Sequence, residues 1–116
     1  MSKIWHITKR EQWQQAKVAQ IYRSETLASE GFIHCSTAQQ VIKVANAFFR
    51  GQQGLVLLGI DSSKVQAEIR YEEVNGTEYF PHIYGALNTD AVIEVLDFEP
   101  SVDGHFELPK PVADMT

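Results

Sequence analysis

The chain has 116 residues, of which 44% are hydrophobic and 22% charged, and this composition indicates one globular domain and excludes wholesale disorder. Fifteen acidic residues against ten basic ones give a formal charge of −5, which argues against a general nucleic-acid or anionic-membrane binder. The single cysteine, Cys35, excludes an internal disulfide, and no apolar run is long enough to cross a bilayer or act as a signal peptide, so we expect a cytoplasmic protein.

The first part of the chain predicts two strands, each leading into a helix. Alternation over residues 3–8 predicts a strand, and Thr8 followed by Glu11 is a capping-box pattern that predicts a helix directly after it. That helix should bury three side chains, which are Trp13, Ala16 and Ala19. Residues 21–30 are predicted to form a loop with one helical turn ended by Gly31, and residues 32–36 a second short strand.

A second helix is predicted over residues 37–50. Ser36 and Thr37 each have a glutamine three residues later, which is a start signal, and Gly51 ends the pattern. Its buried stripe is expected to consist of Val41, Val44, Ala45 and Phe48.

The remainder of the chain predicts strands. Residues 55–60 form an apolar run typical of a buried strand, and Asn75-Gly76 indicates a hairpin between strands at 67–73 and 79–84. Pro81 places the return strand at an edge or a bulge. A last strand is expected at 91–98, followed by a poorly packed tail over residues 100–116, so that residues 1–99 form a single domain. The order of elements predicts an α+β fold with a small, mostly antiparallel sheet and two main helices.

Three histidines stand out as candidates for chemistry. Ile4-Trp5-His6-Ile7-Thr8 and Phe32-Ile33-His34-Cys35-Ser36 share one pattern, in which a strand carries a histidine and then a hydroxyl residue on the same face. His82 lies on the predicted return strand of the hairpin. If the two His-x-hydroxyl strands are neighbours in one sheet, His6 and His34 emerge on the same side and His82 closes a third wall, so we expect the three side chains to line one cleft. Imidazoles titrate near neutrality and serve as acids, bases and ligands. The alternative is that each histidine is hydrogen-bonded locally and that Thr8 and Ser36 only cap helices.

Four residues near these histidines are expected to bind a ligand: Thr8, Ser36, Thr37 and Tyr84. The start of the second helix at Ser36 and Thr37 offers free backbone N–H groups to a phosphate or carboxylate, and Tyr84 offers an aromatic face or a phenolic donor. We expect no metal, because no His-x-His or His-x-x-x-His pair and no second cysteine is present. Glu72 and Glu73, beside the hairpin turn, are interpreted mainly as solvated residues.

Several segments resemble the bacterial family of domain of unknown function 952: Ile-Trp-His-Ile-Thr, residues 27–37, the helix through residues 44–51, and Phe-Pro-His-Ile-Tyr-Gly-Ala-Leu at 80–87. The resemblance covers about residues 3–98. The family in turn looks like a compact relative of the ADP-ribosyltransferase fold, in the branch of the RNA 2′-phosphotransferases, whose sheet is split and barrel-like. This likeness implies that His6 and Thr8 occupy the motif that holds a ribose hydroxyl, and that His34, Ser36 and Thr37 occupy the second motif.

The sequence and the resemblance together give one main functional expectation and two alternatives. The main expectation is a cleft in which His6, His34 and His82 act on or bind NAD, ADP-ribose or a related phosphorylated nucleotide, with transferase-like chemistry as one outcome. The first alternative is a non-catalytic module for a small anionic metabolite or a partner protein. The second is a two-histidine phosphoesterase, although only 28 residues separate His6 from His34, whereas that superfamily repeats its motif on two lobes of a longer chain.

Overall fold

A computed structural model describes residues 3–113, and within them every paired strand runs antiparallel to its neighbour. Three sheets are present, in the orders β1-β4-β8, β3-β6-β5 and β2-β7. The strands are β1 (Lys3–Lys9), β2 (Ile21–Tyr22), β3 (Ile33–His34), β4 (Leu55–Asp61), β5 (Glu68–Val74), β6 (Glu78–Tyr84), β7 (Leu87–Asn88) and β8 (Val92–Phe98). The helices are α1 (Arg10–Ala19), α2 (Glu25–Glu30), α3 (Val41–Phe48) and α4 (Lys110–Ala113), with 3₁₀ turns at Ser62–Lys64 and Thr89–Ala91. The α+β class and the antiparallel pairing are therefore confirmed.

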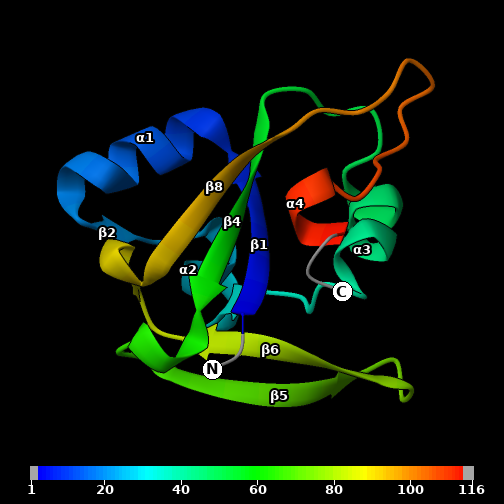
Figure 1. Cartoon of the computed structure of the whole chain (residues 1–116). Helices are drawn as coiled ribbons and strands as arrows, with labels where there is room; N and C mark the ends of the chain where they lie inside the picture. The colour runs from blue at the N-terminus through cyan, green and yellow to red at the C-terminus, as the bar shows by residue number, and fades with distance from the viewer. Residues whose placement is uncertain (1–2, 114–116) are drawn as a thin grey trace.

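The central sheet lies between two layers (Figure 1). α1 covers one side of β1, β4 and β8, α3 and α4 lie on the other, and the β5–β6 hairpin crosses near one end of the sheet. No helix within residues 3–113 is long and apolar enough to cross a membrane.

Strand alternation divides the core into two clusters, one on each face of the central sheet. Val56, Leu58 and Ile60 of β4 belong to one cluster, and Leu55 and Leu57 belong to the other. All seven residues of β4 are buried, as expected for a central strand covered on both faces.

Gly59 is the one position of β4 where a side chain could not fit. A Cβ there would lie 2.8 Å from the Trp5 ring, which packs across the strand from its partner position in β1. The glycine therefore makes room for a fully buried tryptophan.

The hairpin forms where the Asn-Gly signal predicts it. Asn75 and Gly76 have φ angles of 59° and 72°, the left-handed conformation that a tight two-residue turn requires. Pro81, however, lies in β6, the middle strand of its sheet, so the expectation of an edge or bulge is wrong. Its carbonyl accepts a hydrogen bond from the Cys35 amide (3.0 Å) just past the two-residue β3. The proline nitrogen faces the same side, where the ladder has ended and no donor is needed.

The predicted helix 37–50 exists in a shorter form, and its buried stripe is only partly right. Val41 and Ala45 are buried, and Val44 is partly buried. Phe48 is 75% exposed, which contradicts its predicted burial. Ala45 packs into the cluster that contains the stacked rings of Phe98 and Phe106, whereas Phe48 lies outside that cluster.

Helix α1 departs from its expected start. β1 continues to Lys9, no side chain caps the helix, and the Thr8 hydroxyl instead donates to Gln12 Oε1 (2.9 Å). The capping-box prediction for Thr8 is therefore wrong. Trp13 and Ala16 are buried as predicted, whereas Ala19, in the last turn, is exposed.

The segment after Pro100 packs against the domain. Phe106 and Val112 are buried in the cluster that α3 also joins, and Phe106 N and O bond the Asn46 side chain at 2.7 and 3.3 Å. The prediction of a poorly packed tail is wrong as far as residue 112. Burial of two apolar side chains, Phe106 and Val112, stabilises the docked segment despite the prolines and charges around them. Residues 114–116 lie outside the described part of the chain.

Candidate functional site

A cavity of about 470 Å³ opens between β1, α2, α3 and the β5–β6 hairpin. His6, His34 and His82 all line it, so the expected convergence of the three histidines is confirmed as geometry. The remaining wall is mainly aromatic and aliphatic, and consists of Trp5, Ile7, Tyr22, Ser24, Glu25, Thr26, Cys35, Ser36, Val44, Phe48, Phe49, Val74 and Phe80. A size of this order suits a small organic molecule.

His6 is held on both sides of its ring. Its Nδ1 donates to the His34 carbonyl (2.5 Å), which fixes the proton on Nδ1 because a carbonyl can only accept. Its Nε2 lies 2.8 Å from the Tyr22 hydroxyl, which is also 2.9 Å from Thr8 Oγ1. Burial lowers the pKa of His6 to about 4, so the ring is neutral at pH 7. His6 therefore connects β1 to β3 and has no nitrogen left for a ligand.

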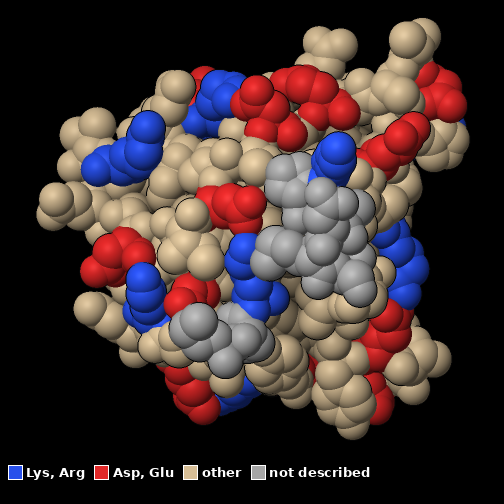
Figure 2. Space-filling view, in the orientation of Figure 1, with Lys and Arg blue, Asp and Glu red and all other residues tan. Residues whose placement is uncertain are grey.

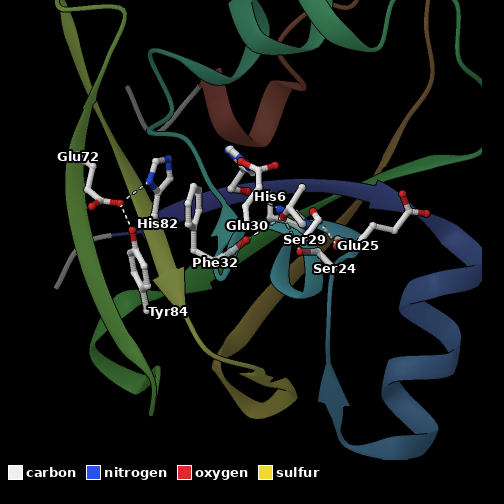
Figure 3. A network of polar contacts seen from close by, with 11 residues as sticks. His6, Ser24, Glu25, Ser29, Glu30, Phe32, Glu72, His82 and Tyr84 are labelled. Carbon is white, nitrogen blue, oxygen red and sulfur yellow. Dashed lines mark hydrogen bonds and ion pairs between the residues drawn. The ribbon is translucent and has the colours of Figure 1, made fainter.

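His82 is buried as deeply as His6, but only one side of its ring is engaged. Nδ1 donates to Glu72 Oε1 (2.8 Å), and the Tyr84 hydroxyl donates to the same oxygen (2.5 Å). The hydrogen bond from Tyr84, followed by that from His82, lowers the pKa of Glu72 and keeps the carboxylate ionised. Figure 3 shows Glu72 bridging the two side chains across the hairpin, with the Phe32 ring beside His82. The Phe32 and His82 rings stack with centroids 4.2 Å apart.

The Glu72–His82 arrangement is that of an oriented base. A carboxylate on Nδ1 selects one tautomer and leaves the lone pair of Nε2 available. Nothing within residues 3–113 hydrogen-bonds His82 Nε2, and the cavity is where a partner would bind.

His34 lies next to His82 and is much more exposed. The two rings make an edge contact with centroids 5.1 Å apart. The Nε2 of His34 donates to Glu30 Oε1 (3.2 Å), and its Nδ1 has no partner in the described part of the chain. Two imidazoles, each with its own carboxylate, thus share one end of the cavity.

Of the four residues expected to bind a ligand, only Ser36 lines the cavity. Thr8 is buried behind Tyr22, and Tyr84 is bonded to Glu72 outside the lining. Thr37 lies at the helix entry, and its N–H donates to Gln40 Oε1 (3.0 Å), while the Ser36 N–H donates to Trp5 O (2.8 Å). An anion at the start of the helix would find both amides already bonded, so this part of the expectation is wrong.

Sequence reasoning underrated or missed several parts of the site. The interpretation of Glu72 as a solvated hairpin residue misses its role. The Asn-Gly register pairs Arg70 with His82, and Glu72 lies two residues beyond Arg70 on the same neighbouring strand. Tyr22 and Phe32 carry no recognisable sequence signal, because their role depends on how a two-residue strand and a loop pack.

Cys35 is buried, and burial raises the pKa of its thiol, so it is no nucleophile. No group of three or more metal-ligating side chains is present within residues 3–113.

Comparison with known proteins assigns the family. The model of "Protein of unknown function (DUF952)" matches residues 7–95 of this chain. The chain belongs to this DUF952 family. The crystal structure of CC0527 from Caulobacter crescentus is 31% identical in sequence, with a TM-score of 0.88 over 97% of this chain and 99% of that one. The solution structure of CC0527 is 32% identical, with a TM-score of 0.81 over 93% and 94% of the two chains. No curated protein is similar enough to count as a match.

Membership in DUF952 places the fold but assigns no reaction. The matched residues include His34 and His82 of the cavity, and His6 lies one residue before the match. The function must therefore be argued from the chemistry of the cavity.

Proposed function

We propose that this DUF952 protein is an enzyme that performs general acid–base chemistry on a small organic molecule bound in the cavity. His82 is the base and His34 the acid. The observation that carries the proposal is the Glu72–His82 pair, with Nδ1 bonded at 2.8 Å and Nε2 left without a protein partner beside a cavity. A buried histidine with such a half-satisfied ring is more typical of a site than of a core.

The surroundings explain how His82 would work. Glu72 fixes the tautomer with a free Nε2, and its negative charge stabilises the imidazolium that forms when Nε2 takes a proton. The Phe32 ring restrains the imidazole plane. His34 can deliver a proton to a second atom of the same ligand, because its ring is 5.1 Å from that of His82 and lines the same cavity.

The three histidines do not share one role in this proposal. His6 uses both nitrogens within the protein and stays neutral, so it shapes the wall and holds the His34 backbone. The expectation that His6, His34 and His82 are all catalytic is narrowed in this proposal to His34 and His82, with His6 as a positioning residue.

The second candidate is the nucleotide expectation, in which the cavity binds NAD, ADP-ribose or a related phosphorylated nucleotide in an ADP-ribosyltransferase-like manner. Its support is the set of rings in the wall, among them Phe48, Phe80 and Tyr22, on which a planar base could stack. In this candidate, protonated His34 and His82 would have to meet the phosphates.

A turnover assay separates the candidates. We would incubate the protein with 2-phenylethyl acetate, NAD, ADP-ribose and adenosine 2′,3′-cyclic phosphate and follow each compound by proton NMR. The variants are His82→Asn, Glu72→Gln and His34→Asn, with His105→Asn as the control, because His105 is exposed and outside the cavity lining.

Under the proposal, the wild type and His105→Asn convert at least one compound. His82→Asn lowers the rate by at least about 100-fold, a usual loss for a general base, and Glu72→Gln and His34→Asn cause smaller losses. If the wild type converts none of the four compounds, or if His82→Asn converts one at the wild-type rate, the proposal fails. Binding without conversion would favour a non-catalytic module.

A further inference from the structure

The charge of the cavity wall restricts what can bind in it. Among residues 3–113, no lysine or arginine lines the cavity, and the acidic residue in the lining is Glu25, on α2. His6 is neutral at pH 7, because its pKa is about 4. An anionic ligand would therefore find no permanent positive charge in the wall.

A carboxylate is also hydrogen-bonded to each of the other two histidines, His34 and His82. Glu72 accepts from His82, and Glu30 accepts from His34 (3.2 Å). Each imidazolium would already be neutralised by its own partner, so a phosphate would compete with a carboxylate for the same charge. Figure 3 shows Glu25 and Glu30 on the α2 side of Phe32, and Glu72 on the hairpin side.

Two basic side chains on elements next to the cavity are paired elsewhere. Lys43 of α3 bonds Glu78, and Arg70 bonds Glu68 (3.0 Å) while covering the Tyr84 ring. On the face seen in Figure 2, basic side chains are interspersed with acidic ones. Neither of these two cations is therefore free to serve the cavity wall.

Most of the remaining lining is apolar, apart from hydroxyl side chains such as Ser24, Thr26 and Ser36. Val44 and Phe48 contribute from α3, Phe49 directly follows that helix, and Val74 and Phe80 lie on the hairpin. Such a wall stabilises an aromatic or aliphatic body by burial, while His82 Nε2, whose Nδ1 carries the proton, accepts a hydrogen bond from an O–H or N–H group.

We infer that the site takes an aromatic alcohol or amine, without phosphate or carboxylate, whose O–H or N–H group donates to His82 Nε2. This inference rests on the proposed function for the role of His82, but the preference for uncharged or cationic ligands follows from the wall alone.

Binding of four matched probes tests the inference. The probes are 2-phenylethanol, 2-phenylethylamine, 3-phenylpropionate and phenyl phosphate, titrated into ¹⁵N-labelled protein and followed by amide shifts of the residues lining the cavity. The expected result is saturable binding of the alcohol and the amine, at least about tenfold tighter than that of either anion, since an uncompensated charge costs that much or more.

A charge-introducing variant sharpens the test. Phe48→Lys places a cation in the lining at a side chain that is 75% exposed, so the fold should tolerate it. It should tighten phenyl phosphate binding at least about fivefold, because one opposite charge at a partly exposed site is worth about 1 kcal/mol. Phe48→Leu controls for the lost ring, and Val18→Lys adds the same charge at an 87% exposed position on α1, outside the lining.

Equal or tighter binding of either anion by the wild type would overturn the inference, as would no saturable binding of the alcohol and the amine up to their solubility limits. The inference and the proposed function can fail separately. Conversion of an anionic substrate that depends on His82 would contradict the ligand class and support the enzyme. Selective binding of the alcohol and the amine with no conversion of any of the four compounds in the turnover assay would support the class and contradict the enzyme.

Discussion

His6 and His82 are equally buried, with 7% and 4% of their surface exposed, yet their surroundings differ in kind. His6 lies among neutral groups, which are a carbonyl and two hydroxyls, and every polar atom of its ring has a partner. His82 lies against a carboxylate that is itself 36% exposed and leaves one ring nitrogen unpartnered. Burial alone therefore does not identify a reactive histidine. A reactive histidine is identified instead by the charge of its hydrogen-bond partners and by how many of its ring nitrogens they engage.

The difference follows from where each ring lies in the sheets. His6 is on β1, where the neighbouring strand β4 is buried throughout and the space behind the ring is filled by Tyr22 and Thr8. His82 is on β6, next to the edge strand β5, whose residues are all either half-buried or exposed. An edge strand can supply a hydrated carboxylate such as Glu72, whereas a buried strand cannot without a large desolvation cost.

Acid should destabilise the protein mainly through His6. Its folded pKa of about 4 lies below the unfolded value of 6.5, so the unfolded state binds more protons between these pH values. The free energy of unfolding should thus be highest above pH 6.5 and fall by about 3 kcal/mol on acidification to pH 4. Urea denaturation at several pH values measures this decline.

His6→Gln removes the titrating group and should flatten the decline between pH 6.5 and 4. His105→Gln, at an exposed histidine, should keep it. The assignment to His6 is wrong if His6→Gln retains the wild-type slope, and His6→Asn serves as a second variant should the glutamine not be accommodated.

A matched pair of tyrosines distinguishes the two regions. Tyr22→Phe leaves the buried Nε2 of His6 without a partner, which should lower the free energy of unfolding by about 2 kcal/mol. Tyr84→Phe also removes a hydroxyl, but water can reach the half-exposed Glu72 carboxylate, so the loss should be below about 1 kcal/mol. Equal decreases in the free energy of unfolding of the two variants, measured by urea denaturation, would mean that water reaches neither hydrogen-bonding group.

Local patterns in the sequence predict the longer strands and the Asn75-Gly76 turn, whereas the two-residue strands β2 and β7 carry no such pattern. The longer strands and the turn are predictable because period-two alternation and a left-handed turn depend on neighbouring residues alone. Phe48 and residues 100–112 failed for the opposite reason. A single 3.6-residue stripe cannot tell which apolar side chain is buried in the core, and the cluster that α3 joins contains Phe106 from the distant C-terminal segment but not Phe48.

The site was predictable in its histidines but not in the division of roles among them. His6 and His34 have the same His-x-hydroxyl pattern, yet one is buried with both nitrogens bonded and the other is exposed beside Glu30. The distinction depends on Tyr22, which reaches His6 from a two-residue strand that no periodicity reveals. Thr37 was assigned to a ligand for a similar reason, since only the structure shows that Gln40 satisfies its N–H.

The smallest effect that we predict is a change in the titration of Glu72, which directly tests the solvent-accessible surroundings of His82. The Tyr84 hydroxyl is the main cause of the lowered pKa of Glu72, ahead of His82. Tyr84→Phe should therefore raise the pKa of Glu72 toward its ordinary value, measured by ¹³C NMR of the labelled carboxyl group, while the hydrogen bond to His82 Nδ1 persists. Because Glu72 ionises below its unfolded value, it stabilises the fold above that value and loses this contribution as the pH falls through the folded pKa. The Tyr84→Phe variant should lose that stability at a higher pH than the wild type.

Tyr79→Phe is the control, because Tyr79 is exposed on the same strand as Tyr84 and its hydroxyl makes no contact with Glu72. An unchanged Glu72 titration in Tyr84→Phe would show that His82 alone holds the carboxylate, and it would leave Tyr84 without a part in orienting the base.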